Sequence, residues 1–182
     1  ILEVPGEVDL AIIVVNAKFV LSTIDQCHEK GIKGICIITA GFKETGKEGA
    51  ELEKQLVEKL KEYGMRCVGP NCLGVVNTHP DIRMDGCFAE SLPERGNIGF
   101  VSQSGALGGG ILNILKDLNL GFAQFISIGN QADVNAETAL EYWENDADVE
   151  QILLYMESIQ NPSNFRRLAS RITKKKPILA LK

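Results

Sequence analysis

The sequence has 182 residues and a hydrophobic content of 45%, enough for one large domain or two small ones with a sizeable core. The net charge of −5 argues against a nucleic-acid partner. No run approaches the roughly 18 apolar residues of a membrane span, so neither a membrane nor a secreted location is expected. Five cysteines without a C-x-x-C pair or a Cys/His cluster predict reduced thiols, a cytoplasmic protein and no metal site.

Short apolar runs alternate with segments of helical periodicity along the chain. The sequence predicts strands at 9–15, 34–39, 65–69, 97–102, 121–128, 150–156 and 177–181. It predicts helices around 19–27, 52–63, 107–118, 136–143 and from Asn161-Pro162 to 172. Continuously apolar strands suit parallel sheets that are covered on both faces, so the alternation predicts open α/β sheets.

The stretch between Asn77 and Gly96 interrupts this rhythm, because it is rich in Pro and Gly and has little periodicity. We therefore predict a domain boundary near Pro93, with one domain over 1–92 and a second over 93–182. The first is expected to be the later part of a Rossmann-like unit, and the second an incomplete flavodoxin-like unit, both with mainly parallel sheets. Because the chain begins with Ile1 close to a strand and ends just after another, we expect both ends to be cuts through a longer protein.

The stretch Ser102-Gln103-Ser104-Gly105 follows a predicted strand and opens a helix that contains three consecutive glycines. The free N–H groups and positive dipole end of such a helix form a natural anion site, and glycines allow a ligand to approach the backbone. The pattern also fits an ordinary helix N-cap with a glycine used for packing. Neither a Walker A motif nor G-x-G-x-x-G is present, so this is not an ordinary nucleotide loop.

Other polar residues also follow predicted strands, at the edge where open α/β sheets bind ligands. They are Val15-Asn16-Ala17, Thr39-Ala40-Gly41, the turn Gly69–Gly74 with Asn71 and Cys72, and Glu157. Each fits a ligand contact, and each also fits an ordinary turn or, for Glu157, an ion pair. The two histidines, His28 and His79, lack the helix-terminus or carboxylate context of a catalytic base.

A family resemblance rests on six segments in a fixed order. They are VVNAKF, ITAGF, GPNCLGVVNT, GFVSQSGALGG, ISIGNQADV and LLYMES. In this order they resemble the NDP-forming acyl-CoA synthetase family along essentially the whole chain, above all the α subunit or α half of ADP-forming acetyl-CoA synthetase. Succinyl-CoA synthetase α is a more distant relative. The resemblance implies a CoA-binding domain followed by a ligase-CoA domain.

The resemblance also implies a reaction and roles for individual residues. The family interconverts acyl-CoA, ADP and phosphate with acid, CoA and ATP through an acyl phosphate and a phosphohistidine. Val15, Asn16, Ala17, Thr39, Ala40 and Gly41 are implied to lie along CoA, with Asn71 and Cys72 near its thioester end. Ser102, Gln103, Ser104 and Gly105 are implied to hold the phosphoryl group, and Glu157 to contact the phosphohistidine.

Three positions depart from the family pattern. Asn16 replaces a usual proline, and Ala40 replaces a glutamate of the succinyl enzyme. Gly109 replaces a tyrosine that lies near the acid in succinyl-CoA synthetase, which argues against a dicarboxylate substrate.

The resemblance places other parts of the machinery outside this chain. The phosphohistidine is expected beyond it, and ADP or ATP with Mg²⁺ on an ATP-grasp β subunit or fused domain, so the fragment alone is expected to be inactive. No cofactor is expected to be covalently bound; CoA, phosphate and a small carboxylic acid are the implied ligands. Two alternatives stay open: a degenerate synthetase module of a protein lysine acetyltransferase, and a non-catalytic CoA-binding protein.

Overall fold

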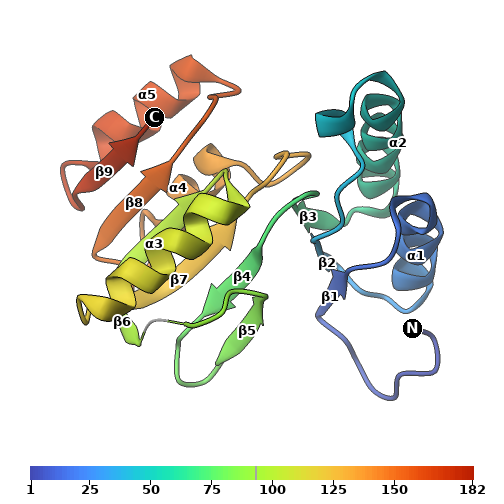
Figure 1. Cartoon of the computed structure of the whole chain (residues 1–182), viewed down its shortest axis with the longest axis horizontal. Helices are drawn as coiled ribbons and strands as arrows, with labels where there is room; N and C mark the ends of the chain where they lie inside the picture. Colours follow the sequence, from blue (N-terminus) through green and yellow to red (C-terminus); the bar gives the residue numbers. More distant parts are fainter. Residues whose placement is uncertain (93) are drawn as a thin grey trace.

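The computed structural model describes residues 1–92 and 94–182, which form two β-sheets with helices packed on them (Figure 1). Pro93, near which the sequence predicts a domain boundary, lies outside the described residues. The division into 1–92 and 93–182 stays a prediction. Among the described residues, no helix has the length and apolarity needed to cross a bilayer.

The first sheet is parallel, with the order β1-β2-β3. It consists of β1 (Leu10–Ile13), β2 (Gly34–Ile37) and β3 (Arg66–Val68). The helices α1 (Ala17–Glu29) and α2 (Lys47–Tyr63) cover one face, and the short helix η1 (Lys43–Thr45) precedes α2 (Figure 1). Alternation along β2 separates the faces: Ile35 and Ile37 pack under the helices, whereas Cys36 packs on the opposite side.

The second sheet has six strands in the order β5-β4-β7-β6-β8-β9. They are β4 (Gly74–Asn77), β5 (Met84–Cys87), β6 (Arg95–Ser102), β7 (Phe122–Ser127), β8 (Gln151–Tyr155) and β9 (Ile178–Leu181). The pairs from β7 to β9 are parallel, whereas β4 is antiparallel to both β5 and β7.

Helices cover both faces of this second sheet (Figure 1). They are α3 (Gly105–Asp117), α4 (Ala136–Trp143) and α5 (Pro162–Ile172). Phe100 of β6 faces Leu112 of α3, and its neighbour Val101 faces Leu140 of α4 and the buried side of α5. A central strand that is buried on both faces explains why the sequence around Phe100 reads as a continuous apolar run.

The predicted fold is confirmed as α/β with mainly parallel sheets. The expectation that 77–96 is irregular is wrong in part, because Met84–Cys87 forms β5 and pairs with β4. The strand was missed because four residues that include Asp85 and Gly86 show no apolar alternation. Its pairing also places residues 74–87, within the predicted first domain, in the second sheet.

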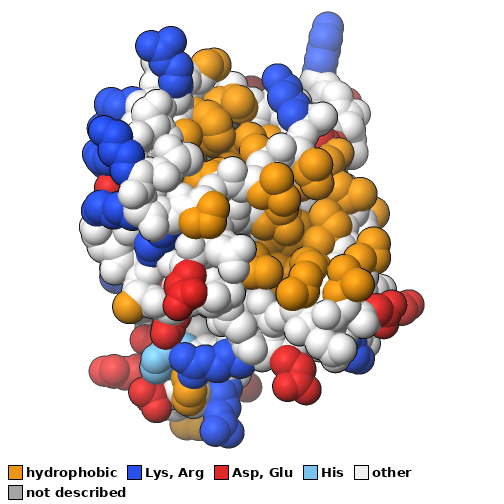
Figure 2. All heavy atoms as spheres, turned by 90° about the vertical axis from the view of Figure 1, so that its left-hand side faces the viewer, with side chains coloured by type: hydrophobic (Ala, Val, Ile, Leu, Met, Phe, Trp, Pro, Cys, Tyr) orange, Lys and Arg blue, Asp and Glu red, His pale blue; other side chains and the backbone are white. Residues whose placement is uncertain are grey.

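A group of exposed hydrophobic side chains lies over α3 and β9 (Figure 2). Ile114 and Leu118 of α3 are 58% and 62% exposed, and Leu179 and Leu181 of β9 are 64% and 48% exposed. Surfaces of this kind commonly pack against other protein segments.

Trp143 provides a test of the core between α4 and the second sheet. It is fully buried, and its indole N–H donates to Gln124 Oε1 at 2.8 Å. We expect Trp143→Ala to lower the free energy of unfolding by about 3–5 kcal/mol, measured by urea denaturation. Tyr142→Ala, at a neighbouring side chain that is 60% exposed, should change it by less than about 0.5 kcal/mol. Equal effects of the two substitutions would contradict this packing.

Candidate functional site

A cavity of about 1080 Å³ lies where the loops after strands of both sheets meet. The first sheet contributes residues that follow β2 and β3, and the second contributes residues that follow β6, β7 and β8. Among those that line the cavity are Ala40, Asn71 and Cys72 from the first sheet, and Gln103, Ser104, Gly105, Asn130, Gln131, Glu157 and Ser158 from the second. The carboxyl edges of the two sheets therefore form one site.

The second sheet reverses its winding at this cavity. From β6 the chain passes through α3 to β7 on one side, and from β7 through α4 to β8 on the other. Such a switch point opens a crevice at the carboxyl ends of the strands, where ligands bind in folds of this type. The Gln103 side chain spans the crevice: its Oε1 accepts from the N–H groups of Glu157 at 2.8 Å and Ser158 at 2.9 Å. The loop that carries the exposed Glu157 carboxylate is therefore tied to the start of α3.

The start of α3 is shaped by hydroxyl groups. Ser104 caps the helix, with its Oγ accepting from the Leu107 N–H at 3.3 Å. Ser102 is fully buried, and its hydroxyl donates to the Ser104 carbonyl at 2.6 Å, so it supports the turn from beneath. The first-turn N–H groups of a helix lack partners within the helix, and here they begin at Gly105 on the cavity wall.

The three consecutive glycines of α3 have different surroundings. A Cβ on Gly108 would lie 3.1 Å from Phe125 and Ser102, so this glycine serves close packing of the helix on the sheet. A Cβ on Gly109 would have only Leu73 nearby, at 3.6 Å, and Gly109 lines the cavity. A Cβ on Gly110 would meet nothing within 4 Å. The sequence suggested two reasons for these glycines, close packing and access for a ligand. The first applies to Gly108, and the second fits Gly109.

The turn that holds Asn71 and Cys72 is locked against the loop after β7. Asn71 has a φ of +57° and its N–H donates to the Thr39 carbonyl at 3.0 Å. A Cβ on Gly129 would lie 2.3 Å from the Pro70 carbonyl oxygen, so only glycine allows the two backbones to approach this closely. The Asn130 N–H then donates to the same carbonyl at 2.9 Å.

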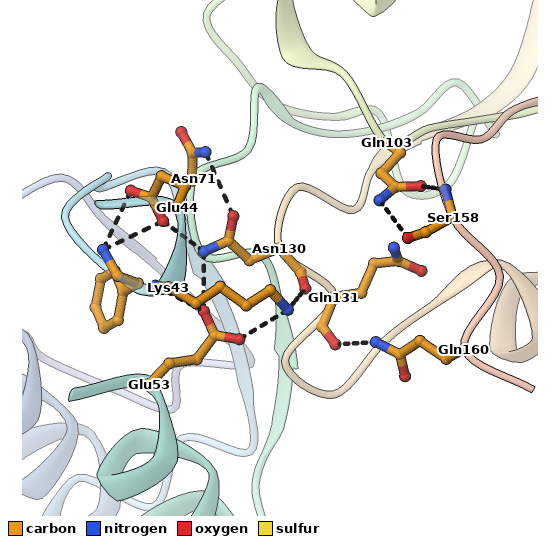
Figure 3. A network of polar contacts seen from close by, with 10 residues as sticks. Lys43, Glu44, Glu53, Asn71, Gln103, Asn130, Gln131, Ser158 and Gln160 are labelled. Carbon is orange, nitrogen blue, oxygen red and sulfur yellow. Dashed lines mark hydrogen bonds and ion pairs between the residues drawn. The ribbon is translucent and has the colours of Figure 1, made fainter. Parts of the chain in front are cut away.

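Asn130 lies at the centre of a polar network on the cavity wall (Figure 3). Its Nδ2 donates to Glu44 Oε2 at 2.6 Å and to Glu53 Oε2 at 2.8 Å, and its Oδ1 accepts from Asn71 Nδ2 at 3.4 Å. Lys43 pairs with Glu53 at 2.9 Å and also donates to the Asn130 carbonyl. One buried amide therefore joins η1, α2 and the turn after β3 to the second sheet.

The environment of Glu44 favours its ionised form. Burial raises the pKa of this carboxyl, but hydrogen bonds from the Asn130 amide and from the N–H groups of Gly41 and Phe42 outweigh burial. Its pKa consequently lies below the ordinary value of 4.5. The Glu44 carboxylate therefore places a negative charge on the cavity wall.

The structure brings seven of the predicted site residues together on the cavity wall, namely Ala40, Asn71, Cys72, Gln103, Ser104, Gly105 and Glu157. The other six support this edge without lining the cavity: Val15, Asn16, Ala17, Thr39, Gly41 and Ser102. The Thr39 hydroxyl donates to the Val15 carbonyl at 2.6 Å, and Asn16 caps α1. The roles of all thirteen toward ligands stay predictions.

Both histidines lie outside the lining of this cavity. The His28 ring stacks on Tyr63 with centroids 3.9 Å apart. The expectation that His79 lacks a carboxylate neighbour is wrong, because its Nε2 lies 3.5 Å from an Asp148 carboxylate oxygen. Within 1–92 and 94–182, no group of three or more His, Cys, Asp or Glu residues is arranged to hold a metal ion.

Sequence reasoning missed Lys43, Glu44, Asn130 and Gln131 as cavity residues. A signal was present for Asn130 and Gln131, because they directly follow β7 and thus share the edge of the other candidates. Gln131 also has a φ of +57°, and Gln160 donates to its carbonyl at 2.9 Å (Figure 3).

Comparison with known proteins agrees with this two-part architecture. A CoA binding domain model matches residues 1–78, and a model of the succinyl-CoA ligase like flavodoxin domain matches residues 95–182. The alpha subunit of the ADP-forming acetate–CoA ligase II of Pyrococcus furiosus is 49% identical over 180 residues. That alignment covers 99% of this chain and 39% of the relative. The chain belongs to the NDP-forming acyl-CoA synthetase family.

Two solved structures share the fold closely. A protein from Pyrococcus horikoshii OT3 is 48% identical with a TM-score of 0.95, over all of this chain and 41% of that one. The dinucleotide forming acetyl-coenzyme A synthetase 1 of Ca. Korarchaeum cryptofilum, in complex with phosphate and ADP, is 37% identical with a TM-score of 0.90, over 99% of this chain and 38% of that one. The chain thus spans about two fifths of the length of these family members.

The lowered pKa of Glu44 gives a pH-dependent prediction. Because the pKa is lower in the folded than in the unfolded chain, the carboxylate stabilises the fold above pH 4.5, and this contribution is lost as the pH falls through the lowered pKa. Between about pH 6 and about pH 3, the wild type should therefore lose more unfolding free energy than Glu44→Gln, measured by urea denaturation. Glu58→Gln, at an exposed position of α2, is the control and should follow the wild type. A Glu44→Gln variant with the wild-type pH dependence would contradict the network.

Proposed function

We propose that this chain is the α part, as a subunit or a fused half, of an ADP-forming acyl-CoA synthetase. The enzyme would interconvert acyl-CoA, ADP and phosphate with acid, CoA and ATP. One observation carries the proposal: Asn71 and Cys72, expected near the CoA thioester, line the same cavity as Gln103, Ser104 and Gly105, expected near the phosphoryl group. Relatives that cover the whole chain are named as an acetate–CoA ligase and an acetyl-coenzyme A synthetase, which supports the ligase over an acetyltransferase module or a binding protein.

The cavity fits CoA and phosphate as neighbouring substrates. The thioester end of CoA would lie against Asn71 and Cys72, whose turn is fixed by the loop after β7. Phosphate would bind at the first-turn N–H groups of α3, beginning at Gly105, where the helix dipole favours a negative charge. Phosphate oxygen would then attack the thioester carbonyl, and the CoA thiolate would leave as the acyl phosphate forms. Fixed N–H donors stabilise the charge that develops there without reorganisation.

Glu157 would act on the phosphoryl carrier. Its backbone is held by Gln103 beside the start of α3, while its carboxylate stays exposed on the cavity wall. A carboxylate at this place would accept a hydrogen bond from one ring N–H of a neutral imidazole, leaving the other nitrogen free to attack the acyl phosphate. It would also stabilise the positive charge that develops on the ring as that nitrogen takes the phosphoryl group and the carboxylic acid leaves as its carboxylate. His28 and His79 are engaged elsewhere, so the carrier histidine would come from a segment outside this chain.

The remaining parts would come from a partner. An ATP-grasp subunit or fused domain would bind ADP or ATP with Mg²⁺ and exchange the phosphoryl group with the carrier histidine. The solved relative that holds phosphate and ADP supports this scheme. The free cysteines, four of them buried, favour a cytoplasmic location.

The acid would be a small monocarboxylic acid that lies over Gly109. No side chain of Gly109 fills this part of the cavity, and Leu73 offers an apolar contact. The charged lining residues are Lys43, which is paired with Glu53, and the acidic Glu44, Glu90 and Glu157. Because negative charges outnumber positive ones on this wall, a second carboxylate on the substrate is disfavoured.

The role of Glu157 is tested in the complete enzyme that contains this chain. We expect Glu157→Gln to lower ATP formation from acetyl-CoA, ADP and phosphate about 100-fold, while CoA binding measured by calorimetry is kept. Glu150→Gln is a matched control, because Glu150 is an exposed glutamate at the other end of β8 that accepts from Asn97. Unchanged ATP formation in Glu157→Gln would overturn the role of this residue.

The acid subsite is tested by filling it. Gly109→Phe should raise the KM for acetate at least about tenfold, because the ring occupies the space of the acid. Gly110→Phe adds the same ring one residue further along α3, where a Cβ meets nothing and the residue does not line the cavity. It should leave the KM for acetate near the wild-type value. Equal KM values for acetate in both variants would place the acid elsewhere.

A further inference from the structure

Two buried cysteines face each other behind the wall of the cavity. Cys36 lies on β2 and Cys72 in the turn after β3, and their Sγ atoms are 3.8 Å apart. Cys36 is fully buried, whereas Cys72 is 4% exposed and lines the cavity. A small molecule in the cavity therefore meets Cys72 first, with Cys36 directly behind it.

The two thiols are chemically different. A hydrogen bond from Cys36 lowers the pKa of Cys72, and the same hydrogen bond, together with burial, raises the pKa of Cys36. Burial also raises the pKa of the three other cysteines, Cys27, Cys67 and Cys87. Because the thiolate is the reactive form, this difference favours Cys72, the cysteine on the cavity wall, over Cys36 as the attacking sulfur.

We propose that Cys36 and Cys72 form an oxidisable dithiol that closes a disulfide when a small peroxide enters the cavity. The Cys72 thiolate attacks the peroxide, the O–O bond breaks, and Cys72 becomes a sulfenic acid as hydroxide leaves. The Cys36 sulfur then attacks Cys72, an S–S bond forms, and water leaves. In total, two thiols and one hydrogen peroxide give one disulfide and two waters.

Closure of this disulfide would alter the cavity. An S–S bond is about 2.05 Å long, so the two sulfur atoms must approach each other by more than 1 Å. Cys36 is held in the ladder of β2, with Val68 of β3 as its register partner, so the new bond would pull on Cys72 and on the turn that Cys72 shares with Asn71. Since that turn is assigned to the thioester end of CoA, oxidation would suppress ligase activity; this consequence rests on the proposed function.

Peptide mapping tests the dithiol without reference to CoA. The complete enzyme is treated with hydrogen peroxide, digested without reduction and analysed by mass spectrometry. We expect a cross-linked peptide pair that contains Cys36 and Cys72, two hydrogens lighter than the reduced peptides and separable by dithiothreitol. Cys27→Ser, at a buried cysteine outside the pair, is the control and should show the same cross-link. Absence of the cross-link, with oxidation of the half-buried Cys87 instead, would overturn the proposal.

Reversibility provides a second measurement. The wild type should lose ATP-forming activity in peroxide and regain most of it with dithiothreitol. In Cys36→Ser, which keeps a side chain of similar size, Cys72 has no partner and proceeds to the sulfinic acid, so activity should not return. Equal recovery in both proteins would overturn the protective role of Cys36. If the cross-link forms at the same rate with and without saturating CoA, the dithiol stands and the placement of CoA beside Cys72 fails.

Discussion

The close pairing of two backbone segments, 67–70 and 130–134, holds the two sheets in one arrangement. The N–H groups of Asn130, Ala132 and Val134 donate to the carbonyls of Pro70, Gly69 and Cys67 at 2.9–3.0 Å. The approach requires glycine at position 129, where a Cβ would lie 2.3 Å from a backbone oxygen. The carboxylate of Asp133 adds hydrogen bonds to the Cys67 N–H and to Arg66. Three of these contacts join backbone atoms and satisfy N–H and C=O groups of both segments.

The cavity follows from this pairing. Each sheet alone offers only half of a site: the first has the turn with Asn71 and Cys72, and the second has the start of α3 and Glu157. Bringing the two carboxyl edges together places the turn with Cys72 and the first turn of α3 on the wall of one cavity. Asn130 strengthens the contact between the sheets, because its amide donates hydrogen bonds to the carboxylates of Glu44 and Glu53. Without these hydrogen bonds the two carboxylates would repel each other at close range. This arrangement supports the proposed reaction, in which phosphate attacks a thioester.

The elements of the fold were predictable from the sequence where burial gives a periodic pattern. The strand around Phe100 and the strand predicted at 150–156 are examples, and their carboxyl ends place Gln103 and Glu157 at the edge of the sheet. The short β5 was not predictable, because its residues have no such pattern. The position of Asn130 after β7 was a signal for the cavity wall, but its polar network was not predictable, because its partner carboxylates lie 77 and 86 residues away in the chain. The approach of Cys36 to Cys72 depends in the same way on the packing of distant segments.

The most direct measurement is a crystal structure of the complete enzyme with CoA and phosphate bound. If the two half-sites act together, the thiol end of CoA will lie beside Asn71 and Cys72. Phosphate will then lie within about 3.2 Å of the N–H groups that begin α3 at Gly105. Phosphate or the CoA thiol bound outside this cavity would contradict the assignment of a single thioester and phosphate site.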